Sequence, residues 1–274
     1  MKINRVWAIY FSPTETTKRT VCRIADRIAD NLSAAREDYD FTLPEMRSGF
    51  PSISGKAGDL VVFGTPTYAG RVPNVLLKYL ASVKGDGALA VPVVTFGNRN
   101  FDNSLLELRD ILTSGGFITV AAAAAACEHS FSHVLGAGRP DKQDFTELDD
   151  FSENVSDLIA ADKFNEHILL PGIPDTYGGY YMPQDRNGLH IDIRKVTPKV
   201  SENCTNCGIC VAVCPMGSID FSDIRKMTGI CIKCGACFKK CPVSARYFDD
   251  DGYLYHKKEL EEIYARRASN SFFI

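Results

Sequence analysis

Blocks of apolar and polar residues alternate along the chain from its start to about residue 165. Short apolar runs, of the kind that form buried strands, are separated by longer stretches in which apolar residues recur every three or four positions. In the first such stretch, 17–32, Val21, Ile24, Ile28 and Leu32 share one helical face. Strands that alternate with amphipathic helices are typical of a parallel sheet wrapped by helices. The pattern therefore predicts an α/β fold.

The predicted elements suffice for a doubly wound, five-stranded parallel sheet. Apolar runs predict strands over 4–11, 36–42, 59–64, 88–96 and 117–126. Helical periodicity predicts helices over 17–32, 73–82, 103–114 and 141–163. We expect the alanine run at 121–126 to be a strand beneath a close-packed helix, because small side chains let the backbones approach.

The pattern changes beyond residue 165, and we divide the chain into four parts. The sheet domain is predicted at 1–165, followed at 166–198 by a linker or wrapping arm rich in proline, glycine and tyrosine. A compact domain with most of the cysteines follows at 199–250. The last part, 251–274, is expected to be a helical tail with its helix at 257–268.

Composition and charge exclude several classes of protein. The 274 residues are 45% hydrophobic and 24% charged, as in ordinary globular proteins. A formal net charge of -3 offers no basic surface for nucleic acid. The longest nearly apolar run, 117–127, is shorter than the roughly 18 residues of a membrane helix, and the first residues lack a secretory signal pattern. We therefore expect a cytoplasmic protein that binds neither nucleic acid nor membrane.

Eight of the ten cysteines form two copies of one motif. Each copy reads C-x2-C-x2-C-x3-C-P, and the copies begin at Cys204 and Cys231, which are 27 residues apart (231 minus 204). This is the spacing of bacterial ferredoxins with two 4Fe-4S clusters, in which the fourth cysteine of each copy ligates the other cluster. The motif predicts a small α+β two-cluster ferredoxin domain. The expected ligands are Cys204, Cys207, Cys210 and Cys241 for cluster one, and Cys231, Cys234, Cys237 and Cys214 for cluster two.

Zinc is the alternative metal for paired CxxC motifs, but it explains neither the third close cysteine nor the proline. The residues between the ligands, such as Ile209, Val211 and Phe238, are mostly apolar. Such shielding favours a low reduction potential, which hydrogen bonds to sulfur would raise. The other two cysteines, Cys22 and Cys127, are expected to be buried free thiols.

Three polar loops, 12–17, 65–70 and 97–101, follow three of the predicted strands. Doubly wound sheets bind ligands beyond the carboxyl ends of their strands, so we expect these loops to meet at one edge. The first loop combines hydroxyl groups with the start of a helix, whose backbone N–H groups can bind phosphate. The others supply Tyr68 and Phe101, which could lie against a planar ring. A further loop is expected at the rim, with its histidines hydrogen-bonded rather than bound to metal: Glu128, His129, Ser130 and His133.

With S-P-T-E-T-T at 12–17, P-T-Y-A-G-R-V-P at 66–73 and G-N-R at 97–99, the N-terminal part resembles flavodoxin. With the cysteine motifs added, nearly the whole chain resembles the flavodoxin-ferredoxin fusion proteins of anaerobic bacteria and archaea. This resemblance implies a flavodoxin-like domain that binds FMN. It implies a phosphate site at Ser12, Thr14, Thr16 and Thr17, and an isoalloxazine site near Thr67, Tyr68, Gly97, Asn98 and Phe101. The implied cofactor-binding set also includes Glu15, Pro66, Ala69 and Arg99.

Glu15 departs from that family, which usually has glycine at this position. A carboxylate there could repel the phosphate, and a side chain disfavours a positive φ. We expect Glu15 to point to solvent while its N–H still donates, with Lys18 and Arg19 offsetting its charge.

These features predict an electron-transfer protein that passes electrons between two 4Fe-4S clusters and FMN, and on to redox proteins such as a ferredoxin or a reductase. The alternative is a self-contained FMN-dependent reductase of a small-molecule acceptor, fed through its own clusters. In a third interpretation, which draws on Glu15, the N-terminal domain only positions the ferredoxin.

The charge pattern adds a hypothesis about how the two halves meet. Segment 141–163 has eight acidic residues and two lysines, so its net charge is 2 minus 8, or -6. Segment 199–250 has seven basic and five acidic residues, 7 minus 5, or +2. Surface charges usually do no more than keep a helix solvated. The sharper hypothesis is that this opposition helps to orient the ferredoxin module on the sheet domain.

Overall fold

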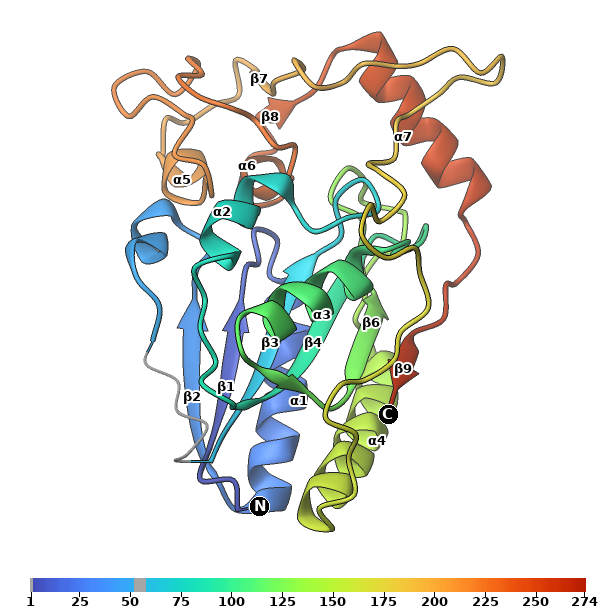
Figure 1. The fold of residues 1–274 in the computed structure, drawn as a ribbon. Helices are drawn as coiled ribbons and strands as arrows, with labels where there is room; N and C mark the ends of the chain where they lie inside the picture. The colour runs from blue at the N-terminus through green and yellow to red at the C-terminus, as the bar shows by residue number, and fades with distance from the viewer. Residues whose placement is uncertain (1, 52–57) are drawn as a thin grey trace.

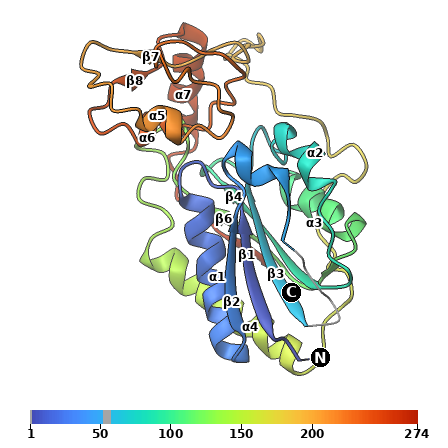
Figure 2. The ribbon, with the colours of Figure 1, turned by 90° about the vertical axis from the view of Figure 1, so that its left-hand side faces the viewer.

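The computed structural model describes residues 2–51 and 58–274. Its main body is a seven-stranded sheet with helices on both faces (Figures 1 and 2). The strands of this sheet are β1 (Arg5–Tyr10), β2 (Ala35–Asp40), β3 (Asp59–Pro66), β4 (Leu89–Phe96), β5 (Ile118–Thr119), β6 (Ala122–Ala126) and β9 (Ser271–Phe273).

The order of the strands identifies the fold. They lie in the order β2-β1-β3-β4-β6-β9, and β5 also pairs with β4. All pairs as far as β6 are parallel. Since β5 and β6 are two pieces of the fifth strand predicted at 117–126, the parallel part has the order 2-1-3-4-5 of flavodoxin-like folds. The predicted flavodoxin-like α/β fold is confirmed.

The end of the chain differs from the prediction of a helical tail. Helix α7 spans Asp251–Ile263, and the chain then returns to the sheet as β9, antiparallel to β6. Asn270 accepts a hydrogen bond from the N–H of Ala126 at 2.9 Å just before this strand. Three residues are too few for the periodicity of a strand to be recognised in the sequence. The same sheet therefore contains strands from before the cysteine-rich segment, β1 to β6, and a strand from after it, β9.

Two hydrophobic cores hold the sheet between its helices. Alternate residues of β1 join opposite cores, Ile9 on the side of α3 and Ala8 on the side of α1. This period of two is that of a strand buried on both faces. The helices of one face are α1 (Thr16–Leu32) and α4 (Lys142–Ala160); those of the other are α2 (Leu77–Leu80) and α3 (Ser104–Ser114), with the short 3-10 helices η1 (Pro44–Ser48) and η2 (Asn74–Leu76) nearby. No helix in the described ranges combines the length and the apolarity needed to cross a membrane.

The first part of segment 166–198 follows an irregular path along the α3 side of the sheet, and the rest continues past α7 (Figure 1). The guanidinium of Arg71 lies over the rings of Tyr177 and Tyr180, 4.7 and 4.8 Å from their centroids. Arg109 donates a hydrogen bond of 2.5 Å to the carbonyl of Ile168. These contacts fasten the first part of the segment, which we call the arm, to the sheet domain.

A small unit stands beyond the carboxyl edge of the sheet (Figures 1 and 2). Gly208 and Gly235 precede its two cysteine-loop helices with φ of 75° and 78°, a conformation that glycine adopts without strain. The unit consists of β7 (Lys199–Val200), α5 (Ile209–Ala212), α6 (Ala236–Lys239) and β8 (Arg246–Tyr247), and β7 pairs with β8 antiparallel. We call it the cluster unit.

Candidate functional site

The eight motif cysteines line two cavities of the cluster unit, four in each. The cluster-one cavity is lined by Cys204, Cys207, Cys210 and Cys241. The cluster-two cavity is lined by Cys214, Cys231, Cys234 and Cys237. Each cavity therefore receives three cysteines from one motif and one from the other, the same grouping that the spacing predicts.

The chemistry of these cavities fits an iron-sulfur cluster. Burial raises the pKa of Cys234 and raises that of Cys237 to about 12, so a bound metal has to displace their protons. Apolar residues such as Ile219 and Ile232 complete the wall of the cluster-two cavity. In the described part of the chain, no three His, Cys, Asp or Glu side chains converge on a single metal ion. A 4Fe-4S cluster does not need such convergence, because each thiolate binds a different iron.

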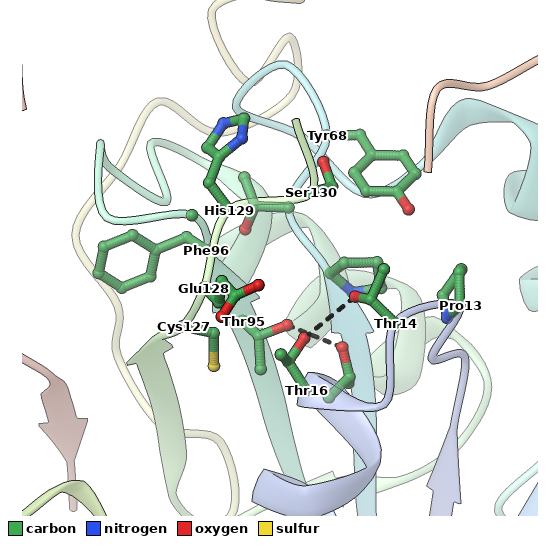
Figure 3. Close-up of a pocket in the computed structure, with 14 residues that line it drawn as sticks. Pro13, Thr14, Thr16, Tyr68, Thr95, Phe96, Cys127, Glu128, His129 and Ser130 are labelled. Atoms are coloured by element: carbon green, nitrogen blue, oxygen red, sulfur yellow. Dashed lines mark hydrogen bonds between the residues drawn. The ribbon is translucent and has the colours of Figure 1, made fainter. Parts of the chain in front are cut away.

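A third cavity lies at the carboxyl edge of the sheet and measures about 410 Å³, part of it open to solvent (Figure 3). This edge is where doubly wound folds bind ligands. We call it the edge pocket. It is lined by Pro13, Thr14, Thr16 and Thr17 after β1, Pro66, Thr67 and Tyr68 at and after the end of β3, Thr95, Phe96 and Gly97 at the end of β4, and Cys127, Glu128, His129 and Ser130 after β6.

The loop after β1 brings hydroxyl groups to a helix N-terminus, as the sequence predicts. The Oγ1 atoms of Thr14 and Thr16 lie 3.5 Å apart, and that of Thr17 lies 2.7 Å from Oγ1 of Thr95. The first N–H groups of α1 have no partner within the helix. Hydroxyl and N–H donors at this place can together bind a phosphate.

Ser12, predicted at the phosphate, does not line the edge pocket. Its Oγ accepts a hydrogen bond of 2.9 Å from the N–H of Lys18, and its own N–H donates to Oγ1 of Thr42 at 2.7 Å. Ser12 is buried and joins the start of α1 to the loop after β2. The prediction was wrong for this residue because its hydroxyl satisfies the backbone.

Asn98 was predicted near a ring but points to the C-terminal segment instead. Its side-chain amide donates to the carbonyls of Tyr264 and Arg266 at 2.8 and 2.6 Å. Its Oδ1 accepts from the N–H of Ala268 at 3.1 Å. Asn98 therefore holds the chain between α7 and β9, a partner that lies 166 or more positions away in the sequence.

The other predicted residues outside the edge pocket are Glu15, which is described below, and Ala69, Arg99 and Phe101. Arg99 forms an ion pair with Asp102, and Phe101 packs on Phe96 with ring centroids 5.6 Å apart. The carbonyl of Ala69 accepts a hydrogen bond from the arm. Their loops are the predicted ones, but these residues do not line the pocket.

Three residues that line the pocket were not among the predicted site residues: Pro13 in the loop after β1, and Thr95 and Phe96 at the end of β4. Cys127, predicted only as a buried thiol, also lines it, and burial raises its pKa to about 12. A rule that includes the last residue of every parallel strand would have found Thr95 and Phe96. Cys22 is half-buried rather than buried.

His129 and Tyr68 stand on opposite sides of the pocket rim (Figure 3). Burial lowers the pKa of His129 to about 3, so the ring is neutral at physiological pH. A Cβ at Gly97 would lie 2.2 Å from Cδ2 of His129, which explains the glycine. His133 leaves the rim and lies against Phe238 of the cluster unit, with centroids 4.6 Å apart.

Glu15 has the left-handed conformation that glycine usually provides, with φ of 67°. For a residue with a side chain this costs about 1–2 kcal/mol. The side chain is half-exposed rather than directed freely to solvent, and Lys18 lies 3.9 Å away, as predicted. The prediction for Arg19 was wrong, because Arg19 donates to the carbonyl of Pro140. The closest cation is Lys240 of the cluster unit, whose Nζ lies 2.5 Å from Oε1 of Glu15.

A second ion pair joins the cluster unit to the pocket rim, between Lys239 and Glu128. Lys239 also donates to the carbonyl of Ser132 at 2.5 Å. Burial raises the pKa of Glu128, but hydrogen bonds from Lys239 and from the N–H of Gly138 outweigh it and lower the pKa overall. The carboxylate is therefore ionised at physiological pH.

The loop of cluster-two cysteines lies directly on the rim. A Cβ at Gly235 would come within 2.5 Å of the carbonyl of Ser130, so the backbones touch. Burial and the neighbouring Cys234 and Cys231 raise the pKa of Tyr68 well above its usual value. Tyr68 therefore lines the edge pocket and lies near the cluster-two cysteines.

The hypothesis that the acidic segment 141–163 orients the cluster unit was wrong. Asp149 pairs with Arg23 of α1 at 2.5 Å, and Asp141 pairs with Arg267 of the C-terminal segment at 2.6 Å. Helix α4 runs beside the sheet while the cluster unit stands at its edge (Figure 1). The opposed charges are instead Glu15 and Glu128 with Lys240 and Lys239.

Comparison with known proteins agrees with the cysteine geometry. Residues 203–246 match the family described as the 4Fe-4S dicluster domain. Together with the flavodoxin-like sheet order, this match is consistent with a flavodoxin-ferredoxin fusion. No curated protein matches the chain significantly.

Solved structures resemble the sheet domain at low sequence identity. A flavodoxin from Streptococcus pneumonia TIGR4 is 16% identical and covers 56% of this chain and 98% of its own, with a TM-score of 0.39. A flavodoxin from the domain Archaea is 11% identical and covers 57% and 99%, with a TM-score of 0.40. An NADH:FMN oxidoreductase in its apo form is 16% identical and covers 65% and 95%, with a TM-score of 0.40. Our fold assignment rests on the strand order.

Proposed function

We propose that the chain is an iron-sulfur flavoprotein in electron transfer, with FMN in the edge pocket and one 4Fe-4S cluster in each cysteine-lined cavity. The observation that carries the proposal is the contact of the cluster-two loop with the pocket rim, where the backbones of Gly235 and Ser130 touch. The match to the 4Fe-4S dicluster domain supports the clusters. The flavodoxin-like sheet and the helix N-terminus below the pocket support FMN.

The residues of the edge pocket divide the work of binding. Thr14 and Thr16, with the first N–H groups of α1, would hold the phosphate. Tyr68 and His129 would flank the flavin ring, and the neutral state of His129 adds no charge there. Glu15 does not oppose the phosphate strongly, because Lys240 and Lys18 offset its charge.

The arrangement suits a converter between one-electron and two-electron transfer. When bound, FMN accepts one or two electrons, whereas a cluster transfers one at a time. The chain holds the cluster-two cysteines against the rim through Lys239 and Lys240, and the apolar wall of that cavity keeps water away. We propose that the outer partners are redox proteins such as a ferredoxin or a reductase.

Cofactor analysis and transient kinetics test this function. Protein purified without oxygen should contain about eight iron and about eight sulfide per chain, with one extractable FMN. Flash reduction of the clusters should be followed by reduction of the flavin at a rate independent of protein concentration. Stoichiometric zinc, or clusters that never reduce the flavin, would refute the proposal. Multiple turnovers with a small-molecule acceptor and no partner protein would favour a self-contained reductase.

A further inference from the structure

Arg246 is the largest fully buried side chain of the described residues, and it lies in the cluster unit. Only 2% of the residue is exposed. Its Nη2 donates to Sγ of Cys210 at 3.2 Å and to the carbonyl of Ile224. Its Nε and Nη1 are buried without any hydrogen-bond partner. A guanidinium in such a place is costly unless an anion with acceptor atoms lies beside it.

The cluster-one cavity provides the place for that anion. Arg246 lines this cavity together with Cys204, Cys207, Cys210 and Cys241. A cluster with its four thiolates carries negative charge, and its sulfur atoms accept hydrogen bonds. The orphaned N–H groups of Arg246 fit the sulfur atoms of a cluster held there.

The second repeat differs from the first at this position. Ile219 follows Cys214 by the same five positions (219 minus 214) as Arg246 follows Cys241 (246 minus 241). Ile219 is also buried, and it lines the cluster-two cavity. At matching positions of the two repeats, one cavity therefore has the apolar side chain of an isoleucine and the other has a cation.

We propose that Arg246 is a positioning residue that raises the reduction potential of cluster one above that of cluster two. Reduction adds one electron to a cluster, supplied by a reduced redox protein, and no bond breaks and no proton moves to Arg246. A nearby cation and N–H donors stabilise the more negative reduced form, which raises the potential. Cluster one then holds the electron, and cluster two, beside the edge pocket, is the stronger reductant toward the flavin. This inference rests on the proposed function.

The apolar shielding read from the sequence predicts low potentials for both clusters alike. Arg246 changes that prediction for cluster one only. The difference between Arg246 and Ile219 is visible in the sequence. An arginine there would ordinarily be expected at the surface, because arginine is almost never fully buried unless it is paired. Only the pairing of β8 with β7 in the folded unit carries its guanidinium into the interior.

Potentiometric titration followed by electron paramagnetic resonance tests the proposal. Wild-type protein should show two one-electron steps, and Arg246→Ile, which makes the repeats alike, should lower the higher one. We expect at least a tenfold change in the reduction equilibrium, which corresponds to about 59 mV for one electron. Arg225→Ile, an exposed site in the same unit, removes the same charge and should leave both steps in place.

Iron and sulfide content separates the possible failures. Wild-type protein without clusters would refute the proposed function itself. Full content in Arg246→Ile with unchanged potentials would refute only the role of Arg246. If Arg246→Ile does not hold its iron, Arg246→Gln serves instead, because it keeps polar N–H groups but no charge. It should lower the reduction potential of cluster one by a smaller amount. An unchanged potential would again refute the role of Arg246.

Wild-type protein alone offers an independent measurement. When it is poised at the midpoint of the first cluster step, proton resonances of the cluster-one cysteines should carry the paramagnetic shifts of the reduced cluster. Selective labelling of cysteine makes these resonances visible. Shifts confined to the cluster-two cysteines would mean that cluster two is reduced first, which would overturn the proposal.

Discussion

The sheet domain and the cluster unit are held together by different forces. In the sheet domain, two large groups of buried apolar side chains lie on either side of the strands. In the cluster unit, the buried apolar group consists of Cys210, Ile219 and Ile224. Such a core cannot offset the chain entropy of folding, and small units of this kind depend on metals. The comparison teaches that one half is stabilised by burial and the other by ligation and docking.

Removal of iron should produce the largest difference between the cluster unit and the sheet domain. With an iron chelator under reducing conditions, we expect the cluster unit to lose most of its structure, because metal binding supplies its folding free energy. Strands β1, β3 and β4 should keep their protection. Amide hydrogen exchange, read separately for 203–246 and for these strands, measures both. Equal protection of the two regions after removal of iron would break the comparison.

Loss of one exchanged ligand should produce a smaller, selective effect. Cys214 lies in the first motif but lines the cavity of the second, so Cys214→Ala should remove iron mainly from cluster two. Iron analysis and electron paramagnetic resonance would show the remaining cluster. Cys22→Ala is the matched control, since Cys22 lies on α1 and should leave all the iron bound. Loss of cluster one instead would show that the cavities are assigned to the wrong cysteines.

Loss of one hydroxyl group of the edge pocket should reduce the free energy of FMN binding by about 1–2 kcal/mol. Thr14 lines the pocket, so Thr14→Ala should weaken FMN binding by this amount, the usual value for a hydrogen bond to a charged group. Calorimetry with FMN and riboflavin measures it, and riboflavin should lose little. Ser12→Ala is the control, because the hydroxyl of Ser12 serves the backbone of Lys18. An equal loss for both flavins would contradict a phosphate site at Thr14.

We expect the smallest effects from the two ion pairs that join the cluster unit to the pocket rim, Lys239 with Glu128 and Lys240 with Glu15. The two pairs should also differ in strength. The side chains of Lys239 and Glu128 are 11% and 25% exposed, whereas those of Lys240 and Glu15 are 30% and 47% exposed. Double-mutant cycles with glutamine substitutions should therefore give a larger coupling energy for the first pair than for the second. The coupling energy of the second pair should be at or below about 1 kcal/mol. The readout is the flash-induced rate of flavin reduction at low and high salt.

The surface pair Lys258 and Glu262 on α7, 75% and 45% exposed, provides a reference for these cycles. Its coupling should be close to zero, and salt should not change the internal rate in its variants. If the pairs of Lys239 and Lys240 gave no more than this reference, the electrostatic part of the docking would be refuted. The contact between Gly235 and Ser130 would then have to hold the cluster unit in place.

Local patterns in the sequence were sufficient for the main strands and helices of the sheet domain. The apolar runs at 4–11 and 88–96 became β1 and β4, and the alanine run became β6. Short elements such as β7, β8 and β9 were not predicted, because two or three residues carry no periodic signal. Strand β9 pairs with β6, which would otherwise be an open edge. The loops of the edge pocket were predicted for the same reason, since the carboxyl ends of parallel strands must meet.

The directions of side chains within those loops depended on distant parts of the chain. Asn98 turns to Tyr264 and Arg266, and Glu15 turns to Lys240, because the cluster unit and the C-terminal segment are adjacent to the loops only in the folded protein. No local pattern carries that information.

The sequence by itself determined which atoms are available: eight cysteines at fixed spacings, a hydroxyl-rich helix start and the alternation that makes a parallel sheet. Tertiary structure alone decided how they are combined. It brought the cluster-two loop into contact with the pocket rim and formed the ion pairs of Lys239 and Lys240 with Glu128 and Glu15. It also buried Arg246 beside one cavity and Ile219 beside the other. The physical reason is range: periodicity and ligand spacing act over a few residues, whereas ion pairing and burial act between any groups that folding brings together.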